Sequence, residues 1–364
     1  MNRSRKRKAA DTPKAIITPR IDALCGGGIS LIIAVFVIAF GHLSQSPVTS
    51  WVLAIELYMI TDVLINGPHF MASYRLLYSK QSNFRKHPWV TMAMPMLGFA
   101  FIGYVIYKCF ANPAATATQP LPIITVLNFA APVFLGWHYV GQSWGMTASF
   151  AFLSGFRMTI PERRLIRCGF YALFLYHVTL ACEAMGLLQQ FLPQDEVGVY
   201  FMRAILSTCR VAVLVTFFLG LWGFIRLSQR EQKHLPMRVW LPWLATYSWY
   251  VMVDVQPSSL FLVQGFHALQ YLMFPVRVEV NEHTTPGHRW PHLIVYYVLL
   301  VVLGVVGFHW ADLIGGVTES RLPIVTATFV TLNLHHYFID AVVWKIRDPE
   351  VRHSLFGHLE PATT

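Results

Sequence analysis

The sequence predicts an all-α membrane protein, a polytopic transmembrane helical bundle of about ten spans with both termini in the cytoplasm. Composition is the first observation: 55% of the 364 residues are hydrophobic and only 13% are charged, whereas a soluble domain carries about 25% charged residues. Apolar stretches long enough to cross a hydrocarbon core of roughly 30 Å recur along the chain. These stretches are continuous and do not alternate with polar residues, which argues against a β-barrel.

Hydropathy along the chain predicts where each span begins and ends. A basic tail at 1–20 comes first, a single transmembrane domain covers 21–346, and a cytoplasmic tail covers 347–364. Pro257 lies in the short link between the seventh and eighth spans, where it could produce a kink instead of a turn. In chain order, the expected spans are 22–42, 51–74, 88–110, 121–155, 166–187, 199–226, 238–253, 258–276, 292–313 and 322–344.

The charges in the loops set the orientation of these spans. A net charge of +10 could suggest a nucleic-acid partner. The basic residues, however, gather in short loops between apolar runs, where the positive-inside rule places them. Loops 43–50 and 111–120 contain no Lys or Arg, and loop 188–198 carries only two acids. The intervening loops hold Lys and Arg, so this alternation predicts both termini inside and no nucleic-acid partner.

Six of the fifteen histidines lie well inside expected spans, where an ionisable side chain is costly and marks a candidate functional site. His69, His267 and His335 lie six to ten residues before the first cationic residue of the inner boundary. At a rise of about 1.5 Å per residue they share a depth of roughly 9–15 Å. His177 reaches a similar depth, and His138 does so only if its span kinks or projects past the membrane. The six residues are His69, His138, His177, His267, His335 and His336.

Imidazoles at one depth on different helices can converge in the core of a bundle and bind a metal. Neutral imidazole is the commonest nitrogen ligand for iron, zinc and copper. The spans offer no cysteine–histidine combination of the kind found in thiolate zinc or blue-copper sites. They also lack the Glu-x-x-His pairing of carboxylate di-iron bundles. An all-imidazole set therefore admits iron, copper or zinc, while each histidine alone could simply form a hydrogen bond between helices.

Two intramembrane acids could orient such histidines, because metal-bound histidines usually donate their other N–H to a carboxylate or carbonyl. Asp62 precedes His69 by seven residues, and Asp340 follows His336 by four and His335 by five. The alternative for each acid is an interhelical hydrogen bond or a protonated carboxyl group. His335 and His336 point about 100° apart on a helix, so at most one of them faces a metal directly. The i, i+4 spacing favours His336 as the partner of Asp340.

Four histidine segments resemble those of a known family. "NGPHFMAS", "GWHYVGQS", "GFHALQY" and "LHHYFIDAV" occur in this order, similar to the Brp/Blh family of bacterial β-carotene 15,15′-dioxygenases. The resemblance implies a non-haem Fe(II) centre held by histidines and O2-dependent cleavage of a polyene to aldehydes. The family's histidines fall on His69, His138, His267 and His335, and its terminal acid falls on Asp340. The chain departs from the family pattern at Ser73, Gln142 or Ser143, Tyr271 and Leu334, and His336 is additional.

We therefore expect an integral membrane, non-haem iron oxygenase, a dioxygenase that acts on a lipophilic unsaturated substrate such as a carotenoid. O2 and the substrate would be its small-molecule partners, and the lipid bilayer of the bacterial inner membrane would be its location. Fe(II) would be held by His69, His138, His267 and His335, with His336 and His177 as further candidate ligands. Polar side chains expected to orient the ligands are Asp340, Asp62, Gln142 and Gln270. Aromatic residues expected to line the substrate pocket, or to form ordinary core, are Tyr139, Trp144, Tyr271, Tyr337 and Phe338.

Two other classes of function remain open at this point. In a transporter or channel, intramembrane acids such as Glu56, Asp62 and Glu183 would form a proton or ion relay with the histidines. The broken helix expected at Gly67-Pro68 favours that reading, and the lack of inverted repeats in the sequence opposes it. In a membrane scaffold or sensor, the histidines would only bond helices together.

Overall fold

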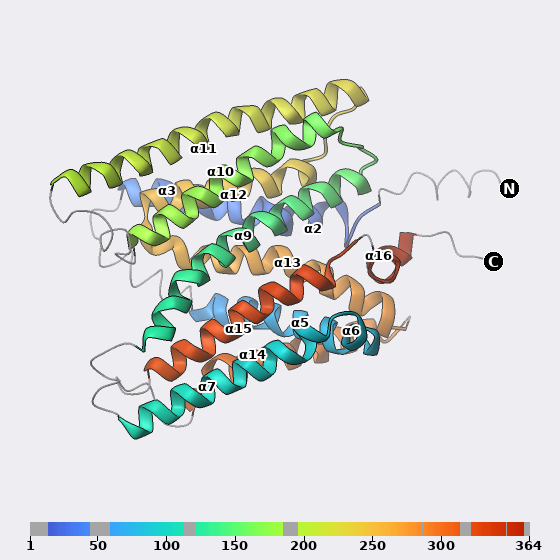
Figure 1. The fold of residues 1–364 in the computed structure, drawn as a ribbon. Helices are drawn as coiled ribbons and strands as arrows, with labels where there is room; N and C mark the ends of the chain where they lie inside the picture. Colours follow the sequence, from blue (N-terminus) through green and yellow to red (C-terminus); the bar gives the residue numbers. More distant parts are fainter. Residues whose placement is uncertain are drawn as a thin grey trace. The chain divides into compact units, whose positions relative to one another are not determined.

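The computed structural model describes residues 14–43, 59–112, 121–184, 196–285, 287–313, 322–346 and 348–359. These residues fold almost entirely into helices and include no β-strand (Figure 1). The all-α prediction is confirmed for this part of the chain. Glu56, one of the acids considered for a relay, lies outside the described residues.

Six of the described helices are long and apolar enough to cross a membrane. This agrees with the membrane class, whereas the count of about ten spans and the position of the termini stay predictions. The six segments are Pro19–Ala39, Trp89–Ala111, Pro122–Leu153, Ile160–Ala184, Glu196–Glu231 and Arg289–Trp310.

The helices fall into two compact units, which we describe separately; the expected single domain stays a prediction. The first unit comprises Met1–Trp51, Tyr139–Phe266 and His358–Thr364, and the second unit comprises Val52–His138 and His267–Gly357. Two long helices, α9 (Pro122–Leu153) and α13 (Leu260–His283), contribute residues to both units.

In the first unit, α12 packs against the N-terminal helices. A Cβ atom on Gly27 would lie 2.5 Å from the carbonyl oxygen of Leu241, so only glycine allows this approach. Arg238 and Asp22 form a buried ion pair with a nitrogen–oxygen distance of 3.3 Å beside this contact. A short 3-10 turn at Pro257–Ser259 separates α12 from α13, so the link at Pro257 joins two helices. Besides its share of α9 and α13, this unit contains α2 (Pro19–Ala23), a π-turn η1 (Leu24–Gly28), α3 (Ile29–Leu43), α10 (Ile160–Ala184), α11 (Glu196–Glu231) and α12 (Met237–Val255).

In the second unit, α5 packs against α14 and α15, and α7 packs against α15. A Cβ atom on Gly304 of α14 would lie 2.9 Å from the carbonyl carbon of Gly67 in α5, so a pair of glycines permits this close approach. Besides its share of α9 and α13, this unit contains the π-turns η2 (Asp62–Asn66) and η3 (Trp89–Ala93), together with α5 (Gly67–Tyr78), α6 (Gln81–Lys86), α7 (Met94–Ala111), α14 (Arg289–Leu313), α15 (Leu322–Val343) and α16 (Pro349–Phe356).

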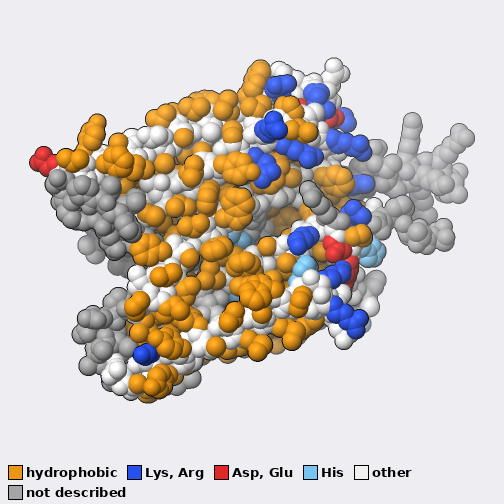
Figure 2. All heavy atoms as spheres, viewed as in Figure 1, with side chains coloured by type: hydrophobic (Ala, Val, Ile, Leu, Met, Phe, Trp, Pro, Cys, Tyr) orange, Lys and Arg blue, Asp and Glu red, His pale blue; other side chains and the backbone are white. Residues whose placement is uncertain are grey.

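The surface of the second unit separates apolar from charged residues. Figure 2 shows mostly hydrophobic side chains over α7 and α15, and a group of charged side chains near α6 and α16. In that charged group, Lys86 Nζ lies 3.2 Å from Asp348 Oδ2 and 2.9 Å from Glu350 Oε2. An apolar surface that ends in a charged group is the pattern expected of helices that leave the hydrocarbon core at this end.

Candidate metal centre

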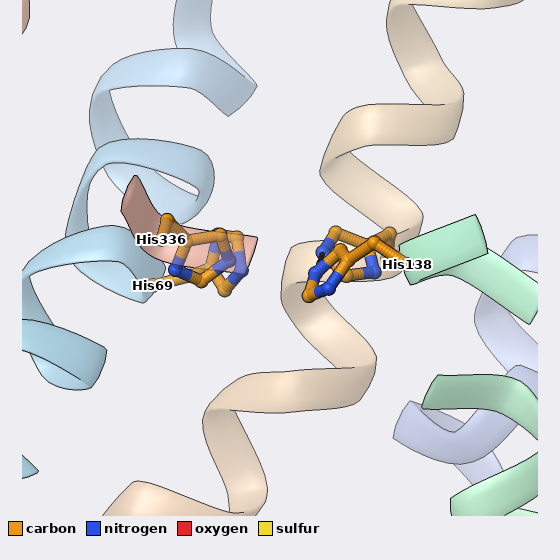
Figure 3. Close-up of side chains that lie close together, drawn as sticks. His69, His138 and His336 are labelled. Carbon is orange, nitrogen blue, oxygen red and sulfur yellow. Dashed lines mark hydrogen bonds between the residues drawn. The ribbon is translucent and has the colours of Figure 1, made fainter. Parts of the chain in front are cut away.

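Four histidines from four helices meet in the second unit: His69 of α5, His138 of α9, His267 of α13 and His336 of α15. One candidate ligand atom from each lies within 4.8 Å of the others, and all four side chains are buried. His69, His138 and His336 point toward one another from separate helices (Figure 3). We call these four residues the histidine cluster; their arrangement could hold a metal ion.

The backbone before His69 determines which of its ring nitrogens faces the cluster. The π-turn η2 ends at Asn66, and Gly67-Pro68 then opens α5. Nδ1 of His69 lies 3.2 Å from the carbonyl oxygen of Asn66. Because a carbonyl oxygen only accepts, this contact places the proton on Nδ1 and leaves a lone pair on Nε2. That Nε2 atom is buried and has no hydrogen-bond partner among the described residues, which fits a nitrogen that binds a metal.

The spacing of His138 and His267 also fits a shared metal. Their Nε2 atoms lie 3.1 Å apart. Two nitrogens bound to one metal at about 2.1 Å, at a right angle, would lie about 3.0 Å apart. The side chain of His138 is 8% exposed, and His267 is 3% exposed, so water does not solvate these nitrogens freely.

The fourth member of the cluster is His336, and here the structure differs from the expectation of His335. His335 uses both ring nitrogens elsewhere: Nδ1 lies 3.0 Å from the hydroxyl of Tyr74, and Nε2 lies 2.8 Å from the carbonyl oxygen of Val90. It therefore ties α15 to α5 and η3, which is the interhelical role considered as the alternative for each histidine. His336, rotated by about 100° on the helix, takes the inward position.

Asp340 lies beside the cluster, one turn after His336. Its Oδ1 atom accepts a hydrogen bond of 2.9 Å from the hydroxyl of Tyr271, and the hydroxyl of Ser73 lies 3.1 Å from the same oxygen. Its Oδ2 atom lies 3.5 Å from Nε2 of His336 and 3.6 Å from Nε2 of His138. Tyr271, which we expected in a substrate pocket, thus holds the Asp340 carboxylate. Ser73, which we did not expect at the site, contacts the same carboxylate oxygen.

Asp62 approaches His69 only through Asn66. Its Oδ1 atom accepts a 2.8 Å hydrogen bond from the side-chain amide of Asn66, whose carbonyl group contacts His69. Its Oδ2 atom lies 3.3 Å from Nε2 of His309 on α14. Sequence reasoning missed Asn66, although its position three residues before His69 is the signal for a contact of this kind.

The remaining expected residues divide between the two units. In the second unit, Gln270 is fully buried one turn after His267, and the ring of Tyr337 lies 4.8 Å from that of His138. Phe338 packs 5.8 Å from Phe134 of α9.

The other four expected residues belong to the first unit. The ring of His177 lies 6.1 Å from that of Tyr139 and 5.9 Å from that of Tyr250. Trp144 packs under the guanidinium of Arg167 at 5.2 Å. The expected Gln142 lies on α9 between Tyr139 and Trp144.

The fold and the site together define a class: a helical protein with membrane-type helices and a buried cluster of four histidines that could hold a metal ion. Comparison with protein-family models, with curated proteins and with solved structures found no match to this chain. The proposal below therefore rests on the site and on the histidine segments of the sequence.

Proposed function

We propose that this protein is an integral membrane, non-haem iron oxygenase that acts on a lipophilic unsaturated substrate such as a carotenoid. The observation that carries the proposal is the convergence of four buried imidazoles from four helices within 4.8 Å. Nε2 of His69 and both ring nitrogens of His336 are buried with no hydrogen-bond partner among the described residues, which is unfavourable by about 1–3 kcal/mol for each group. A metal bound at the cluster would offset this cost.

Hydrogen bonding between helices does not account for the cluster as well as a metal does. His335 shows what a histidine of that kind looks like, because both of its nitrogens have partners. In the cluster, Nε2 of His69 and both ring nitrogens of His336 have no hydrogen-bond partner among the described residues. Four buried imidazole rings gathered within 4.8 Å, with these nitrogens left unpartnered, are typical of a metal site.

Iron is the metal that best combines the donor set with the resemblance of the histidine segments to the Brp/Blh family. The donors are imidazoles with a nearby carboxylate and no thiolate, a combination that suits non-haem Fe(II). When bound, iron would activate O2 and hold it beside the substrate. The protein chain would orient the imidazoles through the Asn66 carbonyl beside His69 and the Asp340 carboxylate beside His138 and His336.

An apolar substrate would reach the cluster from the bilayer along aromatic side chains of α9 and α15. Phe134 is 39% exposed on α9 and packs against Phe338. Tyr337, next to Phe338, packs against His138. This series of aromatic residues would connect the lipid-facing surface with the cluster and exclude water from it.

Metal analysis of the purified protein tests the proposal. We expect near-stoichiometric iron in the wild type and its loss in His69→Ala and His267→Ala. His234→Ala, in an exposed loop of the first unit, is the matched control and should keep its iron. Cleavage of β-carotene to aldehydes that depends on iron and O2 would support the activity. A metal-free wild type that no metal stabilises would overturn the proposal.

A second candidate is a transporter or channel, and one contact favours it. Asp62 is buried and lies 3.3 Å from His309, whose side chain is 27% exposed. These groups could form the start of a proton or ion path toward His69. Ion flux in liposomes that survives removal of the metal and is lost in Asp62→Asn would favour this function over the oxygenase.

A further inference from the structure

The two oxygens of the Asp340 carboxylate have different surroundings. Oδ1 is held by the hydroxyl groups of Tyr271 and Ser73, at 2.9 and 3.1 Å. Oδ2 faces two members of the histidine cluster, His336 at 3.5 Å and His138 at 3.6 Å. The side chain is 8% exposed, so one oxygen is anchored and the other is directed at the cluster.

The identity of the nitrogen that Oδ2 approaches is informative. A carboxylate that merely orients a metal-bound histidine accepts a hydrogen bond from the ring nitrogen that does not bind the metal. In His138 the nitrogen that faces His267 is Nε2, at 3.1 Å. Asp340 approaches that same Nε2 atom. The carboxylate therefore lies on the metal-facing side of the ring.

The distances lead to the same conclusion. Separations of 3.5 and 3.6 Å are longer than the 2.7–3.2 Å of ordinary N–H···O hydrogen bonds. They match the separations of about 3.0–3.6 Å between neighbouring ligands bound at about 2.1 Å to one five-coordinate metal, at angles of 90–120°. Oδ2 and the two Nε2 atoms are thus spaced as neighbours around a common centre.

We propose that Asp340 Oδ2 is a direct ligand, which makes the donor set four imidazoles and one carboxylate. This inference rests on the proposed metal centre and changes the role of Asp340 from orienting a histidine to binding the metal. The hydrogen bonds to Oδ1 fit this role, because ligating carboxylates are themselves hydrogen bonded.

A carboxylate ligand has consequences for the metal and for its reactivity. An anionic oxygen favours Fe(II), Mn(II) or Zn(II) over Cu(I), which prefers soft ligands. It also neutralises one of the two metal charges in an interior where an isolated charge is costly. In an octahedral site, five protein ligands leave one position for an external ligand.

Co(II) is the probe for the test, because its visible absorption reports the number of ligands. We expect the full-length wild type, stripped with a chelator, to bind Co(II) with the weak absorption of a five- or six-coordinate site. Asp340→Asn should lower the Co(II) affinity on the order of 100-fold. Losing a group that only orients a ligand lowers metal affinity by about 10- to 100-fold, so this loss would lie at or beyond the upper end of that range. Its absorption should also strengthen and shift, because a ligand is lost.

Two control variants separate binding from positioning. Ser73→Ala removes one of two contacts to Oδ1 and should lower the affinity by about 10-fold, the lower end of the effect of groups that orient ligands, without changing the shape of the absorption. Glu279→Gln neutralises another buried carboxylate of the second unit, whose partners are Arg75 and His292. It should change neither quantity, which excludes the mere loss of a buried charge as the cause.

Folded Asp340→Asn with the wild-type absorption would overturn the inference while leaving the metal centre intact. A wild type that binds neither iron nor Co(II) would instead overturn the proposed function. Should Asp340→Asn fail to fold, infrared spectra of the wild type with isotope-labelled aspartate decide the matter. Addition of Co(II) should shift one aspartate carboxylate band, and unchanged bands in a Co(II)-loaded protein would contradict direct binding.

Discussion

His335 and His336 are neighbours on α15 with opposite surroundings. Both ring nitrogens of His335 are hydrogen bonded, to Tyr74 and to Val90, whereas those of His336 have no such partner among the described residues. The first histidine holds helices together, and the second faces the cluster. Replacing each histidine by alanine should therefore change a different measurable property of the protein.

We predict that His336→Ala lowers metal affinity at least about 10-fold with little effect on the stability of the metal-free protein. His335→Ala should do the reverse. It leaves the Tyr74 hydroxyl and the Val90 carbonyl without their partner, at about 1–3 kcal/mol for each buried group. Metal titration and chemical unfolding in detergent, applied to both variants, check this. Loss of metal in His335→Ala with wild-type binding in His336→Ala would contradict it.

Glu279, near the charged end of the second unit, provides a prediction on pH. Burial raises its pKa, but hydrogen bonds from Arg75 and His292 outweigh that effect, and the pKa lies below the ordinary value of 4.5. A carboxyl group whose pKa is lowered by folding contributes stability above its unfolded pKa and loses it as pH falls through the folded pKa. We therefore expect the unfolding temperature to fall as pH drops below about 4.5. Glu279→Gln should remove part of this pH dependence; an identical acid slope in the variant would count against it.

At the scale of elements, the approach of α5 to α14 positions His69. Gly67 and Gly304 meet between these two helices, and a Cβ atom on Gly304 would lie 2.9 Å from the carbonyl carbon of Gly67. The π-turn η2 comes directly before this contact, and its last residue, Asn66, bonds to His69. A shift between these helices would therefore move a candidate ligand.

We predict that Gly304→Ala destabilises the protein by about 1–3 kcal/mol, the cost of overpacking a close contact, and weakens metal binding as well. Gly103→Ala on α7 is the matched control, because a Cβ atom there meets nothing within 4 Å. That control should be neutral or stabilising by up to about 1 kcal/mol, since alanine favours a helix. Thermal unfolding of both variants measures the difference in stability. Equal changes in unfolding temperature would show that the contact between Gly304 and Gly67 is not tight.

Some features of these helices could be predicted from the sequence, and others could not. Gly67-Pro68 indicates an interrupted and widened helix ahead of His69. The structure has the π-turn η2 there, within a helix that runs without a break from 59 to 78. This π-turn leaves no hydropathy signal, because it adds a residue to a turn without changing its composition. The choice of His336 over His335 depends on the rotation of α15, which is set by distant partners such as Tyr74 and Val90. Spacing along one helix does not contain that information.

At the scale of the whole molecule, all four cluster histidines belong to the second unit although they are spread over 268 positions, from 69 to 336. His69, His138 and His267 stand out in the sequence because ionisable residues are rare inside apolar spans. The partners Ser73 and Asn66 do not stand out, since small polar residues in helices usually serve packing. The roles of the predicted aromatic residues follow only from their contacts.

Metal binding should stabilise the molecule by linkage, because the site exists only in the folded chain. At a free Fe(II) concentration about 100 times the dissociation constant, we expect about 2.7 kcal/mol of added stability. His267→Ala should gain little from the metal. Unfolding with and without Fe(II), under reducing conditions, makes the comparison. Equal stabilisation of wild type and variant would place the metal at another site.

X-ray absorption at the iron edge of the purified protein asks whether the buried histidine cluster holds iron. We expect near-stoichiometric iron with the scattering pattern of several imidazole ligands, at a distance of about 2.0–2.2 Å, extrapolated from zinc. That pattern should disappear in His69→Ala together with the iron. Purified, folded protein that takes up no iron, or iron whose surroundings contain no imidazole, would show that the cluster is not an iron site.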